Sequence, residues 1–191
     1  KAVKQAYELG GVTPKDIELL EAHGTGTPVG DMKEFSGLKF VYGDQSENDR
    51  WCAIGSVKSQ IGHSKASAGI AGVMKAALSI YHHVLPPTIN VQKPNPAMEI
   101  ESSPFYLNSE LRPWTHNVEG HKRRAGTSAF GFGGTNFHVL LEQHNDENFT
   151  SLLNTGVDFL PLADKNVDAL IAIISYLWIS LFPDTLINPA S

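Results

Sequence analysis

The alanine- and glycine-rich run "KASAGIAGVMKAALSIYHH", residues 65–83, constrains the fold of this chain more than any other stretch. It has helical spacing, and small residues such as Ala68, Gly69 and Gly72 let a neighbouring backbone approach closely. Alanine and glycine gain little from facing water, so the run predicts a core helix. A chain of 191 residues with 41% hydrophobic content is large enough to bury such a helix in a domain core.

Helix and strand patterns alternate along most of the chain. Residues 1–11 are amphipathic and stop at a glycine pair, and residues 32–42 also have helical spacing. Short apolar runs indicate five strands, at 17–23, 51–59, 105–111, 123–130 and 135–143, and the tight loop "GFGG" joins the last two. Residues 84–96 predict a proline-braced loop. We therefore expect an α/β fold in which helices cover a mixed five-stranded sheet.

The composition changes after Glu142. Residues 143–160 are polar and rich in turn-forming types, which is typical of a linker. Residues 161–191 contain an apolar helical pattern from Ala169 to Phe182, too short for the ~20 residues that a bilayer span needs. We expect residues 1–142 to form one domain and residues 161–191 to begin a second.

Charge and cysteine content exclude several classes of function. A formal net charge of −5 provides no basic stripe for nucleic acid. A lone cysteine, Cys52, excludes an internal disulfide framework and fits a reducing, cytoplasmic compartment. The chain opens on a helix-like pattern without a targeting signal or an initiator methionine, so we expect a soluble piece of a larger protein that does not enter a membrane.

Two histidines follow predicted strands and precede predicted helices. His23 begins the glycine–threonine loop of "EAHGTGTPVGD", and His63 stands five residues after Lys58 in "GSVKSQIGHSKASAG". At one sheet edge, such a group supplies hydrogen-bond donors to a carbonyl oxygen that develops negative charge. The alternatives are a turn that carries a histidine, a helix-capping histidine and a surface lysine, and residue types alone leave them open.

Metal and nucleotide sites have weaker support. The sequence contains no HExxH or CxxC pattern, and the adjacent His82 and His83 point in different directions on a helix. A phosphate-binding P-loop needs a glycine–lysine pair, which is absent, and "GTGTPVG" does not have the spacing of a dinucleotide-binding loop. We expect no bound metal.

Four motifs in order resemble the C-terminal half of a β-ketoacyl synthase. They are "EAHGTGTPVGD", "GSVKSQIGHSKASAG", "LPPTINVQKPNP" and "RRAGTSAFGFGGTNFHVLLE". The resemblance covers residues 1–142 and is closest to ketosynthase domains of multidomain polyketide synthases and polyunsaturated fatty acid synthases. It implies a thiolase-like fold with α-β-α-β-α layers, of which this chain holds the second half. The tail from residue 161 resembles the linker region between a ketosynthase and an acyltransferase.

The resemblance also implies a reaction and a set of roles. Ketosynthases catalyse decarboxylative Claisen condensation of an acyl thioester on a cysteine with malonyl-acyl carrier protein. His23 and His63 match the histidines that hold the malonyl thioester oxygen, and Lys58 matches the lysine that organises the site electrostatically. Substrate arrives on the phosphopantetheine arm of the carrier protein, with no cofactor bound directly. Residues that match the arm-contacting threonines and the gating loop are Thr25, Thr27, Gly131, Phe132, Gly133 and Gly134.

Two departures from the family pattern leave alternatives open. The nucleophilic cysteine belongs to the N-terminal half, and Cys52 lies in a strand pattern typical of a buried structural thiol. Gly72 stands where some bacterial synthases carry a glutamate paired with the lysine, so Lys58 needs another partner. We expect the chain alone to be inactive, and the intact parent to be a homodimer that binds acyl carrier protein. A non-catalytic partner of the chain-length-factor type and a thiolase are the alternatives.

Overall fold

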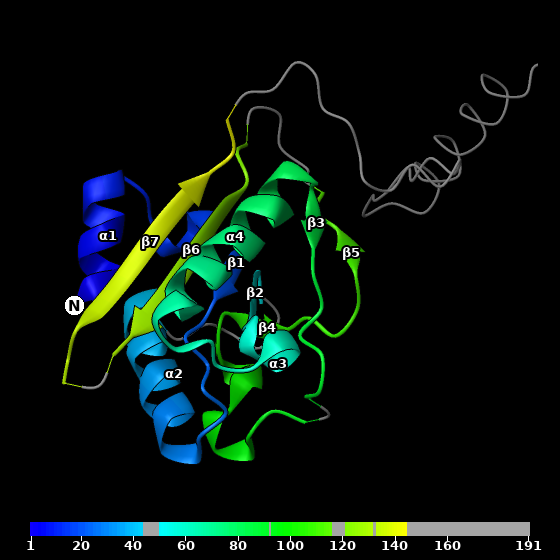
Figure 1. The fold of residues 1–191 in the computed structure, drawn as a ribbon. Coiled ribbons are helices and arrows are strands. Elements are labelled where there is room, and N and C mark those ends of the chain that lie inside the picture. The colour runs from blue at the N-terminus through cyan, green and yellow to red at the C-terminus, as the bar shows by residue number, and fades with distance from the viewer. Residues whose placement is uncertain (44–49, 92, 116–120, 132, 145–191) are drawn as a thin grey trace, which may run out of the picture. The chain divides into compact units, whose positions relative to one another are not determined.

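The computed structural model describes residues 1–43, 50–91, 93–115, 121–131 and 133–144 (Figure 1). Its main sheet has five strands in the order β4-β2-β1-β6-β7. Neighbours among the first four strands run parallel, whereas β7 pairs antiparallel with β6. The predicted mixed five-stranded sheet is therefore confirmed. The strands are β1 (Leu19–Glu21), β2 (Cys52–Gly55), β4 (Phe105–Leu107), β6 (Arg124–Phe130) and β7 (Asn136–Glu142).

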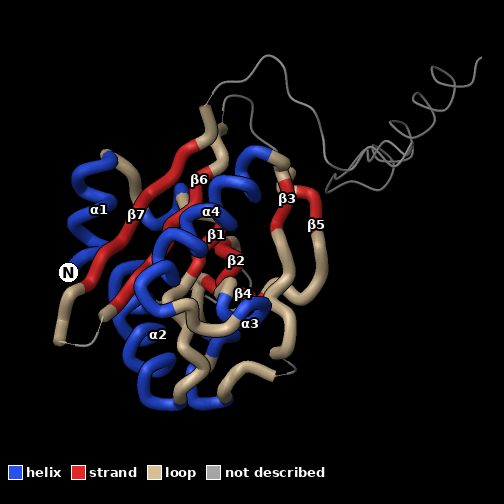
Figure 2. Tube along the Cα trace, in the orientation of Figure 1, coloured by secondary structure: helices blue, strands red, loops and turns tan. Residues whose placement is uncertain are grey.

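Helices cover both faces of this sheet (Figure 2). On one face, α1 (Ala2–Gly10) and α2 (Pro28–Tyr42) pack with Leu20 of β1 in the larger hydrophobic core. On the other face, α4 (Ala68–Tyr81) packs in a second core that contains Leu19. Adjacent strand residues thus enter different cores, because successive side chains of a strand point to opposite faces.

The core helix that the small-residue run predicts is α4, and its residues Gly69 and Gly72 face the sheet. A Cβ atom added at Gly69 would lie 3.2 Å from the Cβ of Ala129, and one at Gly72 would lie 3.0 Å from Cγ2 of Thr127. Glycine therefore lets the helix backbone approach the sheet more closely than larger residues would. The opposite side of α4 carries large exposed apolar side chains, namely Ile70, Met74, Leu78 and Tyr81.

Several local predictions were wrong. The strands expected over 17–23 and 105–111 span only Leu19–Glu21 and Phe105–Leu107. The strand expected over 51–59 ends at Gly55, and Lys58 instead opens the short helix α3 (Lys58–Ile61). The expected loop 84–96 begins with β3 (Val84–Leu85), which pairs antiparallel with β5 (Arg112–Pro113). Strands of two residues show no periodicity in a sequence, so pattern analysis misses them.

Single 3₁₀ turns complete the described fold, at Pro14–Asp16, Lys65–Ser67, Pro96–Met98 and Ile100–Ser102. No helix in the part of the chain that the structure describes is both long and apolar enough to cross a bilayer. The expected second segment, 161–191, and all but the first two residues of the expected linker 143–160 lie outside the described residues.

Candidate active site

The loops with the sequence motifs meet at the carboxyl edge of the sheet. Strands β2 and β6 each pair in parallel with β1, so the carboxyl ends of all three strands lie at the same edge of the sheet. His23 follows β1, the turn to Lys58 follows β2, and the glycine loop follows β6. Open α/β sheets bind ligands at this edge, so the topology brings the candidate residues to a suitable place.

His23 and His63 lie edge to face at the centre of this group. Their ring centroids are 5.5 Å apart, with an angle of 86° between the ring planes. The ring of Phe130, the last residue of β6, lies 6.0 Å from that of His23. Sequence reasoning gave Phe130 no role, because its only signal is its place before the glycine loop. Two imidazoles at this separation can both hydrogen-bond to one small polar group that lies between or beside them.

A backbone contact fixes the tautomer of a neutral His63, and burial and nearby groups act on the pKa of His23. The backbone N–H of Lys65 donates to Nδ1 of His63 over 3.0 Å, so a neutral His63 carries its proton on Nε2. Burial, the charge of Lys58 and the proximity of His63 hold the pKa of His23 below its ordinary value. A neutral His23, and a His63 ring with its proton on Nε2, can each donate a hydrogen bond.

Glu34 fixes the loop that carries His23. One carboxylate oxygen accepts from the backbone N–H of His23 and the other from that of Gly24, each over 2.8 Å. Gly24 has φ of +44°, and a Cβ there would lie 2.8 Å from Cβ of Ser56, so only glycine fits. From the sequence, Glu34 is only one residue of the predicted helix 32–42. Its position eleven residues after the histidine gives no signal of a contact back to the loop.

Lys58 lies half-buried beside two carboxylates. Burial lowers the pKa of its ammonium, and the charges of Glu21 and Glu34 oppose this change. The carboxylates of Glu21 and Glu34 are thus the negative charges that act on Lys58, in place of a glutamate at position 72. In turn, the positive charge of Lys58 acts on His23. The lysine is therefore electrostatically coupled to the histidine pair.

A cavity of about 460 Å³ adjoins these residues. Thr25, Lys58 and His63 line it, and its other walls include apolar side chains of α2 and of the segment 88–100. Thr27 has a structural role as well, since its hydroxyl caps α2 by accepting from the N–H of Gly30 over 3.2 Å. The two threonine hydroxyls are 3.1 Å apart; both residues are exposed, and Thr25 lines the cavity.

The predicted gating loop begins directly after Phe130, whose ring lies beside that of His23. Gly133 and Gly134 have φ of +91° and +88°, and the N–H of Gly131 closes the turn by donating to the carbonyl of Thr135. All three glycines are exposed. Phe132 lies outside the described residues.

Cys52 is not placed to act as a nucleophile. It is fully buried in the core under α1 and α2, and burial raises the pKa of its thiol. Among the described residues, no three histidine, cysteine or acidic side chains are grouped in a way that suits a metal ion.

Comparisons with known proteins identify the family. Residues 1–92 match the family model described as "Beta-ketoacyl synthase, C-terminal domain", and residues 94–178 match "Ketoacyl-synthetase C-terminal extension". The chain belongs to the β-ketoacyl synthase family. It is similar to the C-terminal part of a ketosynthase, as the sequence motifs predicted.

Individual relatives support this assignment. Polyketide synthase PksL of Bacillus subtilis is 45% identical over 144 residues, which are 75% of this chain and 3% of the relative. A chain of the polyunsaturated fatty acid synthase of Thraustochytrium is 44% identical over 155 residues, 77% of this chain and 5% of the relative. The chain thus spans only a few per cent of the length of these relatives.

A solved ketosynthase has the same fold. The ketosynthase from module 1 of the bacillaene synthase of Bacillus amyloliquefaciens is 40% identical, with a TM-score of 0.70. The match covers 76% of this chain and 25% of that structure. The thiolase-like fold is therefore confirmed, and the chain corresponds to one part of a ketosynthase.

Proposed function

We propose that this chain supplies the two-histidine part of a ketosynthase active site for decarboxylative Claisen condensation. The observation that carries the proposal is the edge-to-face pair His23–His63, with ring centroids 5.5 Å apart next to the cavity that Lys58 and Thr25 line. The family match and the polyketide synthase relatives support the same reaction class.

In the proposed reaction, a cysteine supplied by another part of the ketosynthase carries an acyl group as a thioester. Malonyl-acyl carrier protein loses carbon dioxide, and the electron pair of the broken C–C bond forms an enolate. The enolate carbon attacks the acyl carbonyl, forms the new C–C bond and releases the cysteine thiolate. The product is a β-ketoacyl thioester on the carrier protein.

The residues of this chain would act on the enolate oxygen. Neutral His23 and His63 would donate hydrogen bonds to it, and donors that are already in position cost no reorganisation when the charge forms. Lys58 would provide a fixed positive charge beside them. Thr25, which lines the cavity, and the neighbouring Thr27 would hold the phosphopantetheine arm, since both residues are exposed and their hydroxyls are 3.1 Å apart.

The test is alanine substitution of each histidine in an intact ketosynthase, with His82→Ala, at the end of α4, as the control. His23→Ala and His63→Ala should each lower condensation about 10²–10³-fold, the usual cost of one oxyanion donor. Acylation of the cysteine, measured by intact-protein mass, should survive. Unchanged malonyl decarboxylation and condensation in His23→Ala would refute the proposal.

Partner proteins follow from the same reaction. We propose that the chain pairs with the N-terminal half of a ketosynthase, that the intact enzyme is a cytoplasmic homodimer, and that acyl carrier protein delivers substrate. The exposed apolar side of α4 and the incomplete coverage of the relatives' length support the first of these.

A further inference from the structure

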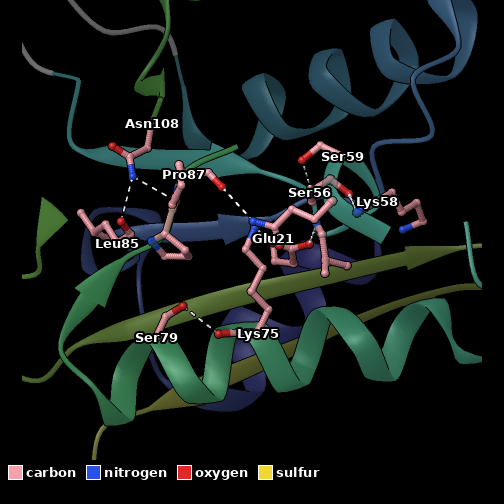
Figure 3. A network of polar contacts seen from close by, with 12 residues as sticks. Glu21, Ser56, Lys58, Ser59, Lys75, Ser79, Leu85, Pro87 and Asn108 are labelled. Carbon is pink, nitrogen blue, oxygen red and sulfur yellow. Dashed lines mark hydrogen bonds and ion pairs between the residues drawn. The ribbon is translucent and has the colours of Figure 1, made fainter. Parts of the chain in front are cut away.

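Glu21 is a buried carboxylate that the sequence motifs give no role. It ends β1, two residues before His23, and its side chain is only 2% exposed. One oxygen, Oε1, accepts from the backbone N–H of Val57, and the other, Oε2, lies 3.0 Å from Nζ of Lys75 (Figure 3). Lys75 is itself 11% exposed. Burying two charges is costly unless they are paired and hydrogen-bonded, and here both conditions are met.

These contacts join three segments of the site. Glu21 belongs to the strand that leads to His23, Val57 to the turn that leads to Lys58, and Lys75 to α4, which follows the His63 loop. The turn is also tied to the first segment by a second bond, since Ser56 Oγ donates to the carbonyl of His23 over 3.4 Å. The Glu21 side chain therefore connects the three segments that carry His23, Lys58 and His63.

The packing of α4 leaves space for this side chain. A Cβ atom on Gly72 would lie 3.1 Å from Cγ of Glu21, so a larger residue would crowd the carboxylate. Lys75 follows three residues later on the same side of the helix, and its ammonium reaches back to the carboxylate. Gly72 thus leaves space for the Glu21 side chain, and Lys75 supplies the opposite charge.

We propose that Glu21 is a positioning residue that locks together the segments carrying His23, Lys58 and His63, and that its negative charge is required beside Lys58. The proposal rests on the proposed function for its catalytic consequence, whereas the contacts themselves do not depend on it. The charged or titratable groups that act on Lys58 and His23 are Glu21 on β1, Glu34 on α2 and the other histidine, His63.

The charge of Glu21 changes the pKa of Lys58 in a definite direction. Burial lowers the pKa of Lys58, and Glu21 raises it by stabilising the ammonium. Removing the charge of Glu21 should therefore lower the pKa of Lys58 further, so that the lysine loses its proton at a lower pH. If condensation needs the ammonium, its rate falls as pH rises through this pKa, and the alkaline limb of the rate profile moves to lower pH.

The experiment compares Glu21→Gln, Lys75→Met and the double variant in an intact ketosynthase. Glutamine keeps an oxygen for the Val57 N–H but carries no charge. Each single variant leaves a buried charge unpaired and should lower thermal stability, whereas the double variant leaves none and should recover most of the loss. Glu18→Gln is the control, because this carboxylate bonds Nε1 of Trp114 and precedes β1, on the side away from His23.

Two readouts separate positioning from stability. The first is the pH profile of condensation, and the second is titration of Lys58 by NMR with ¹³C-labelled lysine, which requires no turnover. In Glu21→Gln and in the double variant, both the pH profile and the Lys58 titration should shift to lower pH. Glu18→Gln should leave both in place.

The outcomes are distinct. A double variant that regains stability but keeps the lowered Lys58 titration supports the proposal. A double variant that regains the parent titration and pH profile overturns it, since Glu21 would then be only half of a structural ion pair. A parent enzyme that does not condense would refute the proposed function, while the Lys58 titration would still decide the role of Glu21.

Discussion

At the scale of the residue, the charge of Lys58 and the protonation of His23 depend on each other. Lys58 lowers the pKa of His23 together with burial and His63. Lys58→Met in an intact ketosynthase should therefore raise the pKa of His23, so that the ring becomes cationic at a higher pH. NMR titration of the His23 ring protons measures this directly. Lys33→Met, on the outer side of α2, is the control, and an unchanged or lowered His23 pKa in Lys58→Met would contradict the expected coupling.

Cys52 provides a second prediction at this scale. Because the thiol is fully buried and its pKa is raised, it should not react with iodoacetamide or acyl thioesters in the folded protein. Mass spectrometry should find no adduct under native conditions and complete alkylation in denaturant. Acyl transfer to Cys52 accompanied by condensation would show that this chain carries its own nucleophile, contrary to the prediction from the motifs.

Some site residues could be predicted from the sequence and others could not. His23, Lys58 and His63 stand in motifs after strands, so their meeting at one sheet edge follows from a parallel topology. Glu21 and Glu34 act through contacts with segments 10–54 residues away, as in the bonds to His23, Val57 and Lys75. A single sequence records no such pairings, because a carboxylate near a strand or helix end is equally compatible with solvent.

At the scale of the element, the seating of α4 on the sheet depends on where its glycines lie. The helical pattern predicted the existence of α4 and its small-residue face, whereas the tight contacts at Gly69 and Gly72 emerged only from the three-dimensional packing. The short β3–β5 pair and the helix that begins at Lys58 were missed, because their formation depends on tertiary hydrogen bonds. One example is the bond from Nδ2 of Asn108 to the carbonyl of Leu85.

Two glycine-to-alanine substitutions test this packing. In Gly37→Ala on α2, the added Cβ would have no atom within 4 Å. The substitution should stabilise an intact ketosynthase by about 0.5–1 kcal/mol, because alanine has the higher helix propensity. Gly72→Ala has the same propensity gain, but its Cβ would press on Thr127 and Glu21 at 3.0 and 3.1 Å. We expect it to lower the melting temperature and condensation together. A Gly72→Ala variant as stable as Gly37→Ala would show that α4 has room to move.

At the scale of the whole molecule, one face of α4 has no partner among the described residues. Ile70, Met74, Leu78 and Tyr81 are spaced along one side of the helix and are 54–58% exposed. An apolar stripe of this kind marks an interaction surface or leads to association in a free chain. Under the proposed function, this is the face that the N-terminal half of a ketosynthase would cover.

We therefore predict that the 191-residue chain associates or binds hydrophobic dye when it is expressed alone. Met74→Lys with Leu78→Lys should make the isolated chain more monodisperse in size-exclusion chromatography, because the charges break the stripe. The same pair should lower the melting temperature of an intact ketosynthase by several degrees, since it would bury unpaired charges. Phe40→Lys is the control, because Phe40 is 87% exposed on α2 and should affect neither protein in this way. A parent chain that is monodisperse alone, melts cooperatively and binds no dye would show that α4 needs no covering half.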